Sequence, residues 1–324
     1  GCGVLGSTVN PFAIGVGVDS LKQVGIEANQ GLILGLGALL WIVTTAMAIV
    51  YMMRYAKKVK ADKGSTILSL QEQKDMEENF AKGVEETEDV KLTGRQKGVL
   101  IVFAITFVIM IVGFIPWESF GINFFVAWSA FLTGLPLGQW YFNETAAWFL
   151  IAAIIVAFVG GLSENKFINS FIAGAADMFG VLLVIALARS ITVLMGDTGL
   201  DMWILENAAQ LLAGVSGVLF APMSFLLSLG ISFLIPSSSG LLTVAMLIMG
   251  PLAQSLGFSP EVMLMIFSAG NGLINLFTPT CGFIMGGLAA AKVDWATWVK
   301  FSWKIIAAIG VVTCVILTVA MVIF

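Results

Sequence analysis

The chain has 324 residues, of which 59% are hydrophobic and only 11% are charged, and its mean hydropathy is +0.99. Soluble domains carry roughly 25% charged residues, so a water-soluble fold of this size is excluded. The net charge of −4 and the pI near 4.9 argue against nucleic acid as a partner. Histidine is absent and the three cysteines form no CxxC pair, so neither a zinc site nor a disulfide framework is indicated.

Apolar stretches that could cross a bilayer recur along the chain. A membrane-spanning helix needs roughly 20 mostly apolar residues. The candidates are Gly31–Met53, Gly98–Ile115, Thr145–Gly161, Met178–Met195 and Phe301–Phe324. A weaker stretch, Phe120–Trp140, is interrupted by glycine and proline and is interpreted as a re-entrant or interfacial segment. The sequence therefore predicts an all-α, polytopic membrane protein.

Most of the charge is concentrated in one segment, Arg54–Lys97, which holds ten basic and nine acidic residues. Positive charge in loops marks the cytoplasmic side, and alternation of the spans then places fourteen of the sixteen basic residues there. We interpret the segment as a solvated cytoplasmic linker rather than a regulatory domain. It separates Gly1–Met53 from Gly98–Phe324.

Three polar interruptions lie within apolar sequence: "GSTVNPFAIG" (Gly6–Gly15), "IPSSSGL" (Ile235–Leu241) and "FTPTCGFIMGG" (Phe277–Gly287). Non-helical backbone at membrane depth is tolerated where it lines a protein-enclosed cavity, and many secondary transporters build their sites at such discontinuous helices. The alternative is that the small residues only pack helices together. Proline beside three serines frees backbone groups instead of packing helices, so a binding site is favoured.

The second and third interruptions divide two longer apolar stretches. Ala213–Leu256 is broken at Pro236–Ser239 and is interpreted as a re-entrant hairpin with those residues at its tip. Glu261–Ala291 is broken at Thr278–Gly282. The first and third interruptions also resemble each other and are predicted to run in opposite directions, as in an inverted repeat.

The stretches "GCGVLGSTVNPFAIG", "IPSSSGLLTVAMLIMGPLAQ" and "NGLINLFTPTCGFIMGG" resemble the C4-dicarboxylate anaerobic carrier family, and most closely its YfcC-like branch, within the ion-transporter superfamily. The resemblance implies an inverted-repeat elevator transporter that works as a homodimer. It also implies that this chain is a fragment without the first hairpin and the helices before it. Its parts would be the end of the first repeat (1–53), the linker (54–97) and the second repeat (98–324), with the hairpin at about 213–256, an unwound helix at about 260–291 and a final transmembrane helix.

The resemblance also assigns residues to the site. Ser237–Ser239 match the tip of the second hairpin, Thr278–Thr280 the unwound segment after it, and Ser7–Pro11 the corresponding segment of the first repeat. The tip has serine where the superfamily motif has asparagine, which leaves the substrate and ion open. Asn271 and Asn275, four residues apart, share a helix face just before the third interruption. The residues expected to bind substrate or ion are Ser7, Thr8, Asn10, Ser237, Ser238, Ser239, Asn271, Asn275, Thr278 and Thr280.

Arg189 is the one charged residue in the interior of a predicted span, since Lys304 lies at the cytoplasmic end of Phe301–Phe324. It could face a substrate carboxylate with bidentate geometry, or extend to the outer interface as a structural residue, and both interpretations stay open. The tryptophans fall mostly near predicted interfaces, so an aromatic belt explains them better than ligand contact. This group is Trp41, Trp117, Trp140, Trp295, Trp298 and Trp303.

Glu261 is the only charged residue between Ala213 and Ala291, so the predicted site offers hydroxyls, amides and helix ends. Helix N-termini favour anions and carbonyl ends can coordinate Na⁺, whereas a proton relay would need acidic or histidine side chains. We therefore expect a secondary active transporter of a small organic anion, such as a C4-dicarboxylate, in a bacterial cytoplasmic membrane. Na⁺ is the candidate coupling ion, and no other cofactor or metal is expected. An arginine/ornithine-type amino-acid exchanger is the alternative, and the spans lack the clustered side chains of an enzyme.

Overall fold

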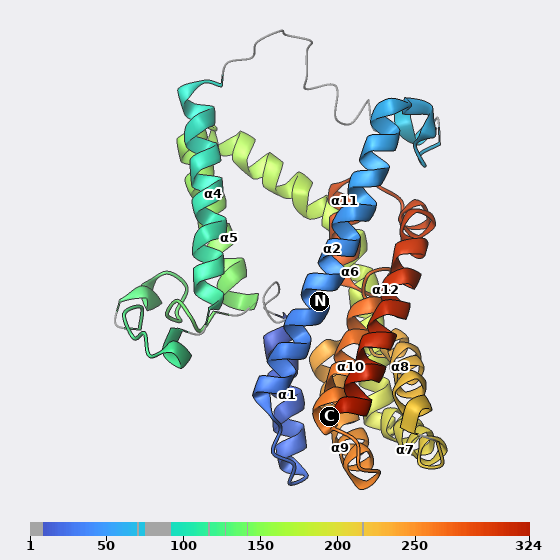
Figure 1. Cartoon of the computed structure of the whole chain (residues 1–324). Helices are drawn as coiled ribbons and strands as arrows, with labels where there is room; N and C mark the ends of the chain where they lie inside the picture. The colour runs from blue at the N-terminus through green and yellow to red at the C-terminus, as the bar shows by residue number, and fades with distance from the viewer. Residues whose placement is uncertain are drawn as a thin grey trace. The chain divides into compact units, whose positions relative to one another are not determined.

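The computed structural model describes residues 9–69, 71–74, 92–115, 117–126, 128–140, 142–215 and 217–324. The side chains of residues 9–12 and of Arg189 are not part of this description. Within the described residues the regular structure is entirely helical (Figure 1), which confirms the predicted all-α class. Five of the described helices are long and apolar enough to cross a membrane.

The longer helices are α1 (Val9–Gln23), α2 (Gln30–Ala61), α4 (Gly94–Phe114), α5 (Phe142–Gly160), α6 (Glu164–Thr198), α7 (Leu200–Leu212), α8 (Gly217–Leu234), α9 (Ser238–Ser255), α10 (Pro260–Ile274), α11 (Gly282–Ala290) and α12 (Trp295–Ile323). Short 3₁₀ helices occur at η1 (Lys63–Ser65), η2 (Trp117–Phe120) and η3 (Ser129–Phe131).

Helices α2, α4, α5 and α12 cover four of the predicted spans to within one residue at their C-terminal ends. The fifth, Met178–Met195, lies inside the longer helix α6, and the weaker stretch Phe120–Trp140 forms turns and η3 instead of a regular helix.

The first interruption differs from expectation. Helix α1 begins at Val9 and continues through Gly15, so Asn10 and Pro11 lie in its first turn instead of in unwound chain. Proline is tolerated there because the first amides of a helix have no partner within the helix. Ser7 and Thr8 lie outside the described residues.

The chain forms two compact units, residues 79–176 and a second unit made of 1–78 and 177–324. In the first, α4 and α5 pair, and the Trp140 ring packs against Gly113, where an added Cβ would lie 2.4 Å from the ring. The Trp148 indole donates to the Thr106 carbonyl at 3.0 Å. Aromatic rings and close helix contact thus hold this pair together.

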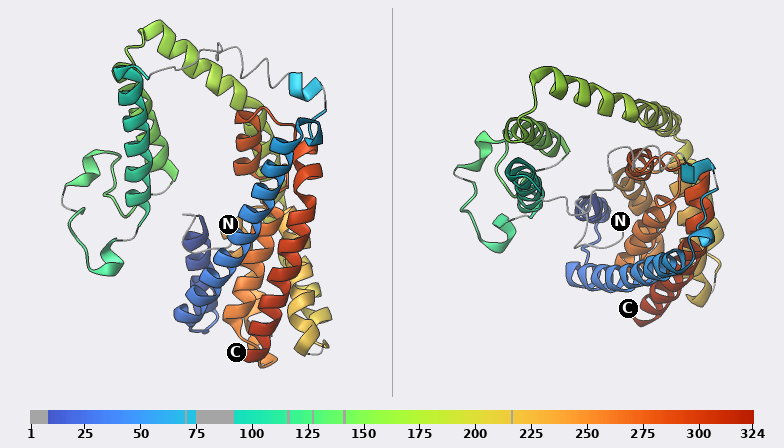
Figure 2. Two further views of the ribbon diagram at one scale, coloured as in Figure 1. Left: turned by 45° about the horizontal axis from the view of Figure 1, so that its top comes forward. Right: turned by 90° about the horizontal axis from the view of Figure 1, so that it is seen from above.

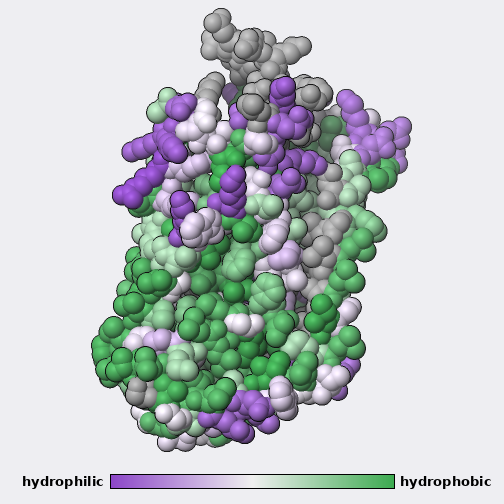
Figure 3. Space-filling model, turned by 90° about the vertical axis from the view of Figure 1, so that its right-hand side faces the viewer, coloured by the Kyte–Doolittle hydropathy of each residue, from purple (hydrophilic) through white to green (hydrophobic). Residues whose placement is uncertain are grey.

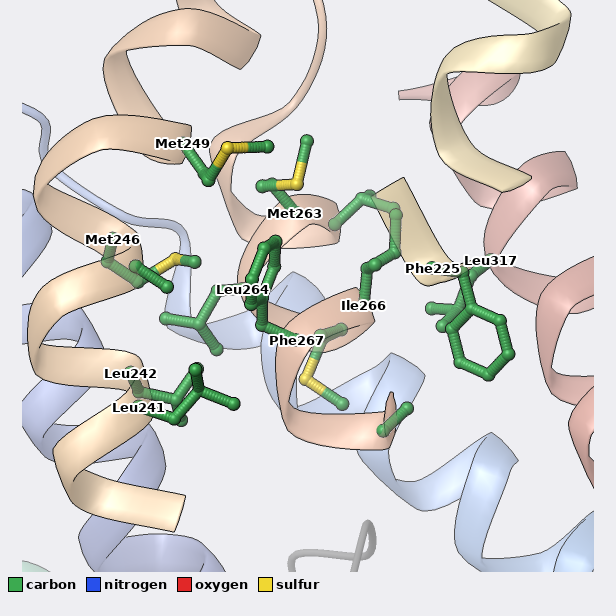
Figure 4. Packing of buried hydrophobic residues seen from close by; sticks show 14 of the residues in the cluster. Phe225, Leu241, Leu242, Met246, Met249, Met263, Leu264, Ile266, Phe267 and Leu317 are labelled. Atoms are coloured by element: carbon green, nitrogen blue, oxygen red, sulfur yellow. The ribbon is translucent and has the colours of Figure 1, made fainter. Parts of the chain in front are cut away.

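Helix α10 is the centre of the second unit. Every residue from Val262 to Asn271 is buried, because α1, α2, α8, α9 and α12 all pack against this helix (Figures 1 and 2). A helix that is apolar on all sides is expected in such a position. In the close view of Figure 4, Met246 and Met249 of α9 lie near Met263 and Leu264 of α10.

Glycine allows two of these helix pairs to approach closely. A Cβ at Gly250 of α9 would lie 2.2 Å from Leu21 of α1. A Cβ at Gly270 of α10 would lie 2.0 Å from the Ser228 hydroxyl of α8. Small residues at crossing points are typical of helices packed within membranes.

One carboxylate joins the turn between α1 and α2 to the start of α10. Glu261 accepts a hydrogen bond from the Asn29 backbone N–H at 2.8 Å and another from the Ser259 hydroxyl at 2.7 Å. Ser259 in turn is the N-cap of α10, and Asn29 is the N-cap of α2. The starts of two helices are therefore fixed to each other by one side chain.

Large apolar side chains are exposed along α2 and α12, including Ile42, Ile49, Val311 and Val315, each more than half exposed. On the face shown in Figure 3 a broad hydrophobic band separates hydrophilic ends. Apolar surface of this extent marks contact with lipid or another protein. With the candidate spans, it fits an integral membrane protein.

Candidate substrate-binding site

The chain between α8 and α9 forms a three-residue tip, Ile235–Ser237. Ser237 is the N-cap of α9, and its hydroxyl accepts the Gly240 amide at 3.3 Å. The next residue, Ser238, donates its hydroxyl to Asn271 Oδ1 on α10 at 2.7 Å. Ser239 is half-buried, and its carbonyl accepts the Thr243 hydroxyl. The helix-weakening residues thus give α9 a capped start beside α10.

Asn271 and Asn275 hold this tip in place. The Asn271 amide group donates to the carbonyls of Ile235 and Pro236, at 3.3 and 3.4 Å. Asn275 donates to the Pro236 carbonyl at 3.0 Å and to Asn271 Oδ1 at 2.8 Å. The carbonyls of the non-helical tip therefore find their partners on α10, as buried backbone groups require.

Asn275 also retains an unused acceptor. Its Oδ1 atom is buried and has no hydrogen-bond partner among the described residues. An amide oxygen can accept two hydrogen bonds, and a buried acceptor left alone costs about 1–3 kcal/mol. A bound donor or cation would satisfy it.

Helix α10 ends at Ile274, and α11 begins at Gly282. In the connection, Thr278 is fully buried and its hydroxyl lies 2.9 Å from that of Thr280. Cys281 is the N-cap of α11 and supplies no side-chain cap. Helix α9 thus begins beside Asn271, through the Ser238 hydrogen bond, and α11 begins shortly after Asn275 in the sequence. The first amides of a helix favour anions.

Of the ten residues expected at the site, the structure joins Ser238, Asn271 and Asn275 in one hydrogen-bond network. Ser237 and Ser239 flank Ser238 in the chain, and the hydroxyls of Thr278 and Thr280 pair with each other. The remaining three, Ser7, Thr8 and Asn10, lie outside the described residues or have no described side chain, and so does the Arg189 side chain. Their roles stay predictions.

Two residues that the sequence placed in an aromatic belt contact the broken helix directly. The Trp298 indole donates to the Leu276 carbonyl at 2.9 Å, and the Trp295 indole donates to the Phe277 carbonyl at 2.7 Å. Both tryptophans begin α12, about twenty residues after the carbonyls, and nothing in the local sequence signals the pairing.

A separate groove of about 560 Å³ runs between α8, α10 and α12. Ser302 is its one polar lining residue, and apolar side chains such as Phe225, Leu273 and Ile306 form the rest. A polar solute would lose its hydration there without replacement. The groove is therefore not a second candidate for the polar substrate site.

The segment after α2 docks on α12 through Glu72, whose carboxylate accepts the Ser69 amide at 2.7 Å and the Thr297 hydroxyl. Hydrogen bonds from Ser69 and Thr297, with a smaller contribution from the Lys300 charge, lower the pKa of Glu72 from 4.5 to about 2. Stabilisation from a carboxyl with a lowered pKa is complete above the unfolded-state value and is lost as the pH falls through the folded-state value.

We therefore expect the segment to stay docked down to about pH 4.5 and to be released as the pH approaches 2. Pepsin cleavage within residues 62–74, compared between wild type and Glu72→Gln, measures this. The variant should be cleaved faster than wild type at pH 4.5 and at the same rate at pH 2. A constant ratio of the two rates would contradict the assignment.

A neutral polar site built from interrupted helices within an all-α membrane protein is the arrangement by which secondary transporters bind solutes. The model of the C4-dicarboxylate anaerobic carrier family matches residues 1–322, so the chain belongs to that family. This confirms the resemblance seen in the sequence, and a carrier family is compatible with the expectation that the protein is not an enzyme.

Two curated relatives match nearly the whole chain. An uncharacterized protein of Haemophilus influenzae is 28% identical over 313 residues, which cover 97% of this chain and 56% of the relative. A putative basic amino acid antiporter, YfcC, of Escherichia coli is 23% identical over 325 residues, which cover 97% of this chain and 58% of the relative. The chain spans about half the length of the curated relatives it matches. No solved structure matches it.

Proposed function

We propose that this protein is a secondary active transporter of a small organic anion, such as a C4-dicarboxylate, in a bacterial cytoplasmic membrane. The observation that carries the proposal is the network in which Asn271 and Asn275 join the Ile235–Ser237 tip to the broken end of α10. Substrate bound beside this network would move with it in an elevator mechanism. By the family resemblance, the working unit would be a homodimer.

The chemistry of the site supports an anion. The amides at the starts of α9 and α11 and the hydroxyls of Ser239, Thr278 and Thr280 are donors for a carboxylate. From α8 through α11 the one charged side chain is Glu261, and it is bonded to Asn29 and Ser259. A carboxylate substrate at the Ile235–Ser237 tip would therefore meet no carboxylate of these helices other than Glu261, which is engaged at the start of α10.

We propose Na⁺ as the coupling ion. The buried Asn275 Oδ1 atom and the paired hydroxyls of Thr278 and Thr280 are neutral oxygen ligands of the kind that coordinate Na⁺ at interrupted helices. Proton coupling would need a titratable side chain at this position, and Glu261 is already held at the start of α10.

An amino-acid exchanger is a second candidate, and the same Asn275 Oδ1 atom favours it. A buried acceptor without a partner would suit an ammonium or guanidinium donor of the substrate. The Escherichia coli relative is named as a putative basic amino acid antiporter. Substrate tests must therefore include arginine.

Counterflow in liposomes distinguishes these functions. Labelled succinate, aspartate and arginine would be tested with and without Na⁺, in wild type, Ser238→Ala and the control Ser255→Ala. Ser255 is exposed at the far end of α9, and within the described part of the chain its hydroxyl donates only to the Leu252 carbonyl of the same helix. We expect Na⁺-dependent succinate counterflow that falls at least tenfold in Ser238→Ala and is unchanged in Ser255→Ala. Arginine counterflow without a succinate signal would contradict the dicarboxylate assignment and favour the exchanger.

A further inference from the structure

The last carbonyls of the broken helix are held by α12. After α10 ends, the amides of Leu276 and Phe277 still bond back to Leu273 and Ile274. Among the described residues the carbonyls of Leu276 and Phe277 have no such helical partner, and they accept hydrogen bonds from the indole N–H groups of Trp298 and Trp295 instead. A backbone carbonyl without a helical partner needs another donor, so these indoles determine where the chain lies directly before Thr278.

The start of α12 is itself fixed by two contacts from the end of α2. The Tyr51 hydroxyl donates to the Phe301 carbonyl at 2.6 Å. The Tyr55 ring packs edge-on against the Phe301 ring, with centroids 4.7 Å apart. Helices α2 and α12 accordingly run side by side in the views of Figures 1 and 2.

Glu72 makes a third contact with α12, at Thr297, which lies between Trp295 and Trp298 in the sequence. Its Oε1 atom accepts the Thr297 hydroxyl, while its Oε2 atom accepts the Ser69 amide. The Glu72 amide bonds back to the Ser69 hydroxyl at 3.2 Å, which completes a reciprocal capping box. The carboxylate is thus oriented by its own turn before it meets α12.

We propose that Trp295 and Trp298 are positioning residues of the substrate site, and that the segment after α2 holds them in place through the contact between Glu72 and Thr297. This inference rests on the proposed transport function, because it assigns a role at the same site. It predicts that a segment outside the membrane-spanning helices sets the substrate affinity without touching substrate.

Because the Leu276 and Phe277 carbonyls accept indole hydrogen bonds, they are also less available to coordinate the proposed ion. A carbonyl oxygen engaged by an indole is a poorer Na⁺ ligand than a free one, so the coupling ion would be left with side-chain oxygens such as Thr278 and Asn275. Removing one indole N–H should therefore disturb substrate affinity and the Na⁺ dependence together. If the indoles served only in packing, a variant as stable as wild type would keep the wild-type substrate affinity and Na⁺ dependence.

The first test replaces each tryptophan by phenylalanine, which keeps a ring and removes the donor. Trp303→Phe is the matched control, because Trp303 lies on the same helix, is 55% exposed and donates no hydrogen bond to any of the described residues. One lost hydrogen bond corresponds to roughly a two- to tenfold change in an equilibrium constant. We expect Trp298→Phe to raise the half-saturating substrate concentration about fivefold at an unchanged maximal rate, with no change in Trp303→Phe.

The second test is a double-mutant cycle with Thr297→Val and Glu72→Gln. Each should raise the half-saturating concentration about two- to threefold, and the double variant should match the single ones, because both remove the same contact. Effects that multiply in the double variant would overturn the role of Glu72. Unchanged substrate affinity in Trp298→Phe would overturn the positioning role of the tryptophan.

Hydrogen exchange separates this inference from the proposed function, because it needs no substrate. Trp298→Phe should increase amide exchange between Leu276 and Gly282 several-fold relative to Trp303→Phe. This result would support the positioning role even if none of the three solutes is transported. Unchanged exchange in that segment would contradict the role, whatever the transport result.

Discussion

Replacing Asn271 by alanine should abolish substrate binding and lower the melting temperature of the protein. The side chain is 1% exposed and links Ser238, Asn275 and the tip carbonyls through its amide group. Each buried polar group that loses its partner costs about 1–3 kcal/mol, and removal of this amide affects several groups at once. We expect a loss of roughly 3 kcal/mol in stability together with the loss of the tip geometry.

Asn207→Ala is the matched control, because Asn207 is exposed on α7 and, as far as the described residues go, its side chain donates only to the Trp203 carbonyl of that helix, at 2.7 Å. Melting followed by intrinsic fluorescence and substrate binding by calorimetry would be measured on both variants. Substrate binding by Asn271→Ala at the wild-type affinity would contradict the assignment of Asn271 as the residue that holds the tip.

Gly270→Ala should destabilise the contact between α8 and α10 and reduce transport. The added Cβ would lie 2.0 Å from the Ser228 Oγ atom and 2.9 Å from its Cβ atom, both in a fully buried position. Overpacking of this kind costs typically about 1–3 kcal/mol. Since Asn271 follows directly, the displacement would also reach the site.

The companion variant Ser228→Gly removes both clashing atoms, so the double variant should recover most of the lost stability and transport. Gly230→Ala on α8 is the control, because nothing lies within 4 Å of the added Cβ there, and it should melt at or above the wild-type temperature. If Gly270→Ala alone melts like wild type, the two helices are not packed as closely as described.

Much of the site could be predicted from the sequence because its parts are local. Proline, serine and glycine within apolar stretches predict where a helix must be interrupted. The structure has the second interruption at Ile235–Ser237 and the third at Asn275–Cys281, close to the predicted positions. The four-residue spacing of Asn271 and Asn275 likewise predicts a shared face, and the structure joins the two side chains directly.

The first interruption shows the limit of the local pattern. "GSTVNPFAIG" contains the same residue types as the other two, yet the chain is helical from Val9 onward. Proline in a first turn and proline in a helix interior give the same sequence signal, and only the position of the helix start distinguishes them.

By itself the sequence determined the all-α membrane class, the family and the interrupted helices, because composition and backbone chemistry act within a few residues. Tertiary structure alone decided which groups satisfy the freed carbonyls: Asn275 for Pro236, Trp298 for Leu276 and Trp295 for Phe277. It also decided that Glu72, within a predicted solvated linker, contacts Thr297 more than two hundred residues later. The physical reason is that a hydrogen bond between distant segments depends on how helices pack, and no local pattern specifies that packing.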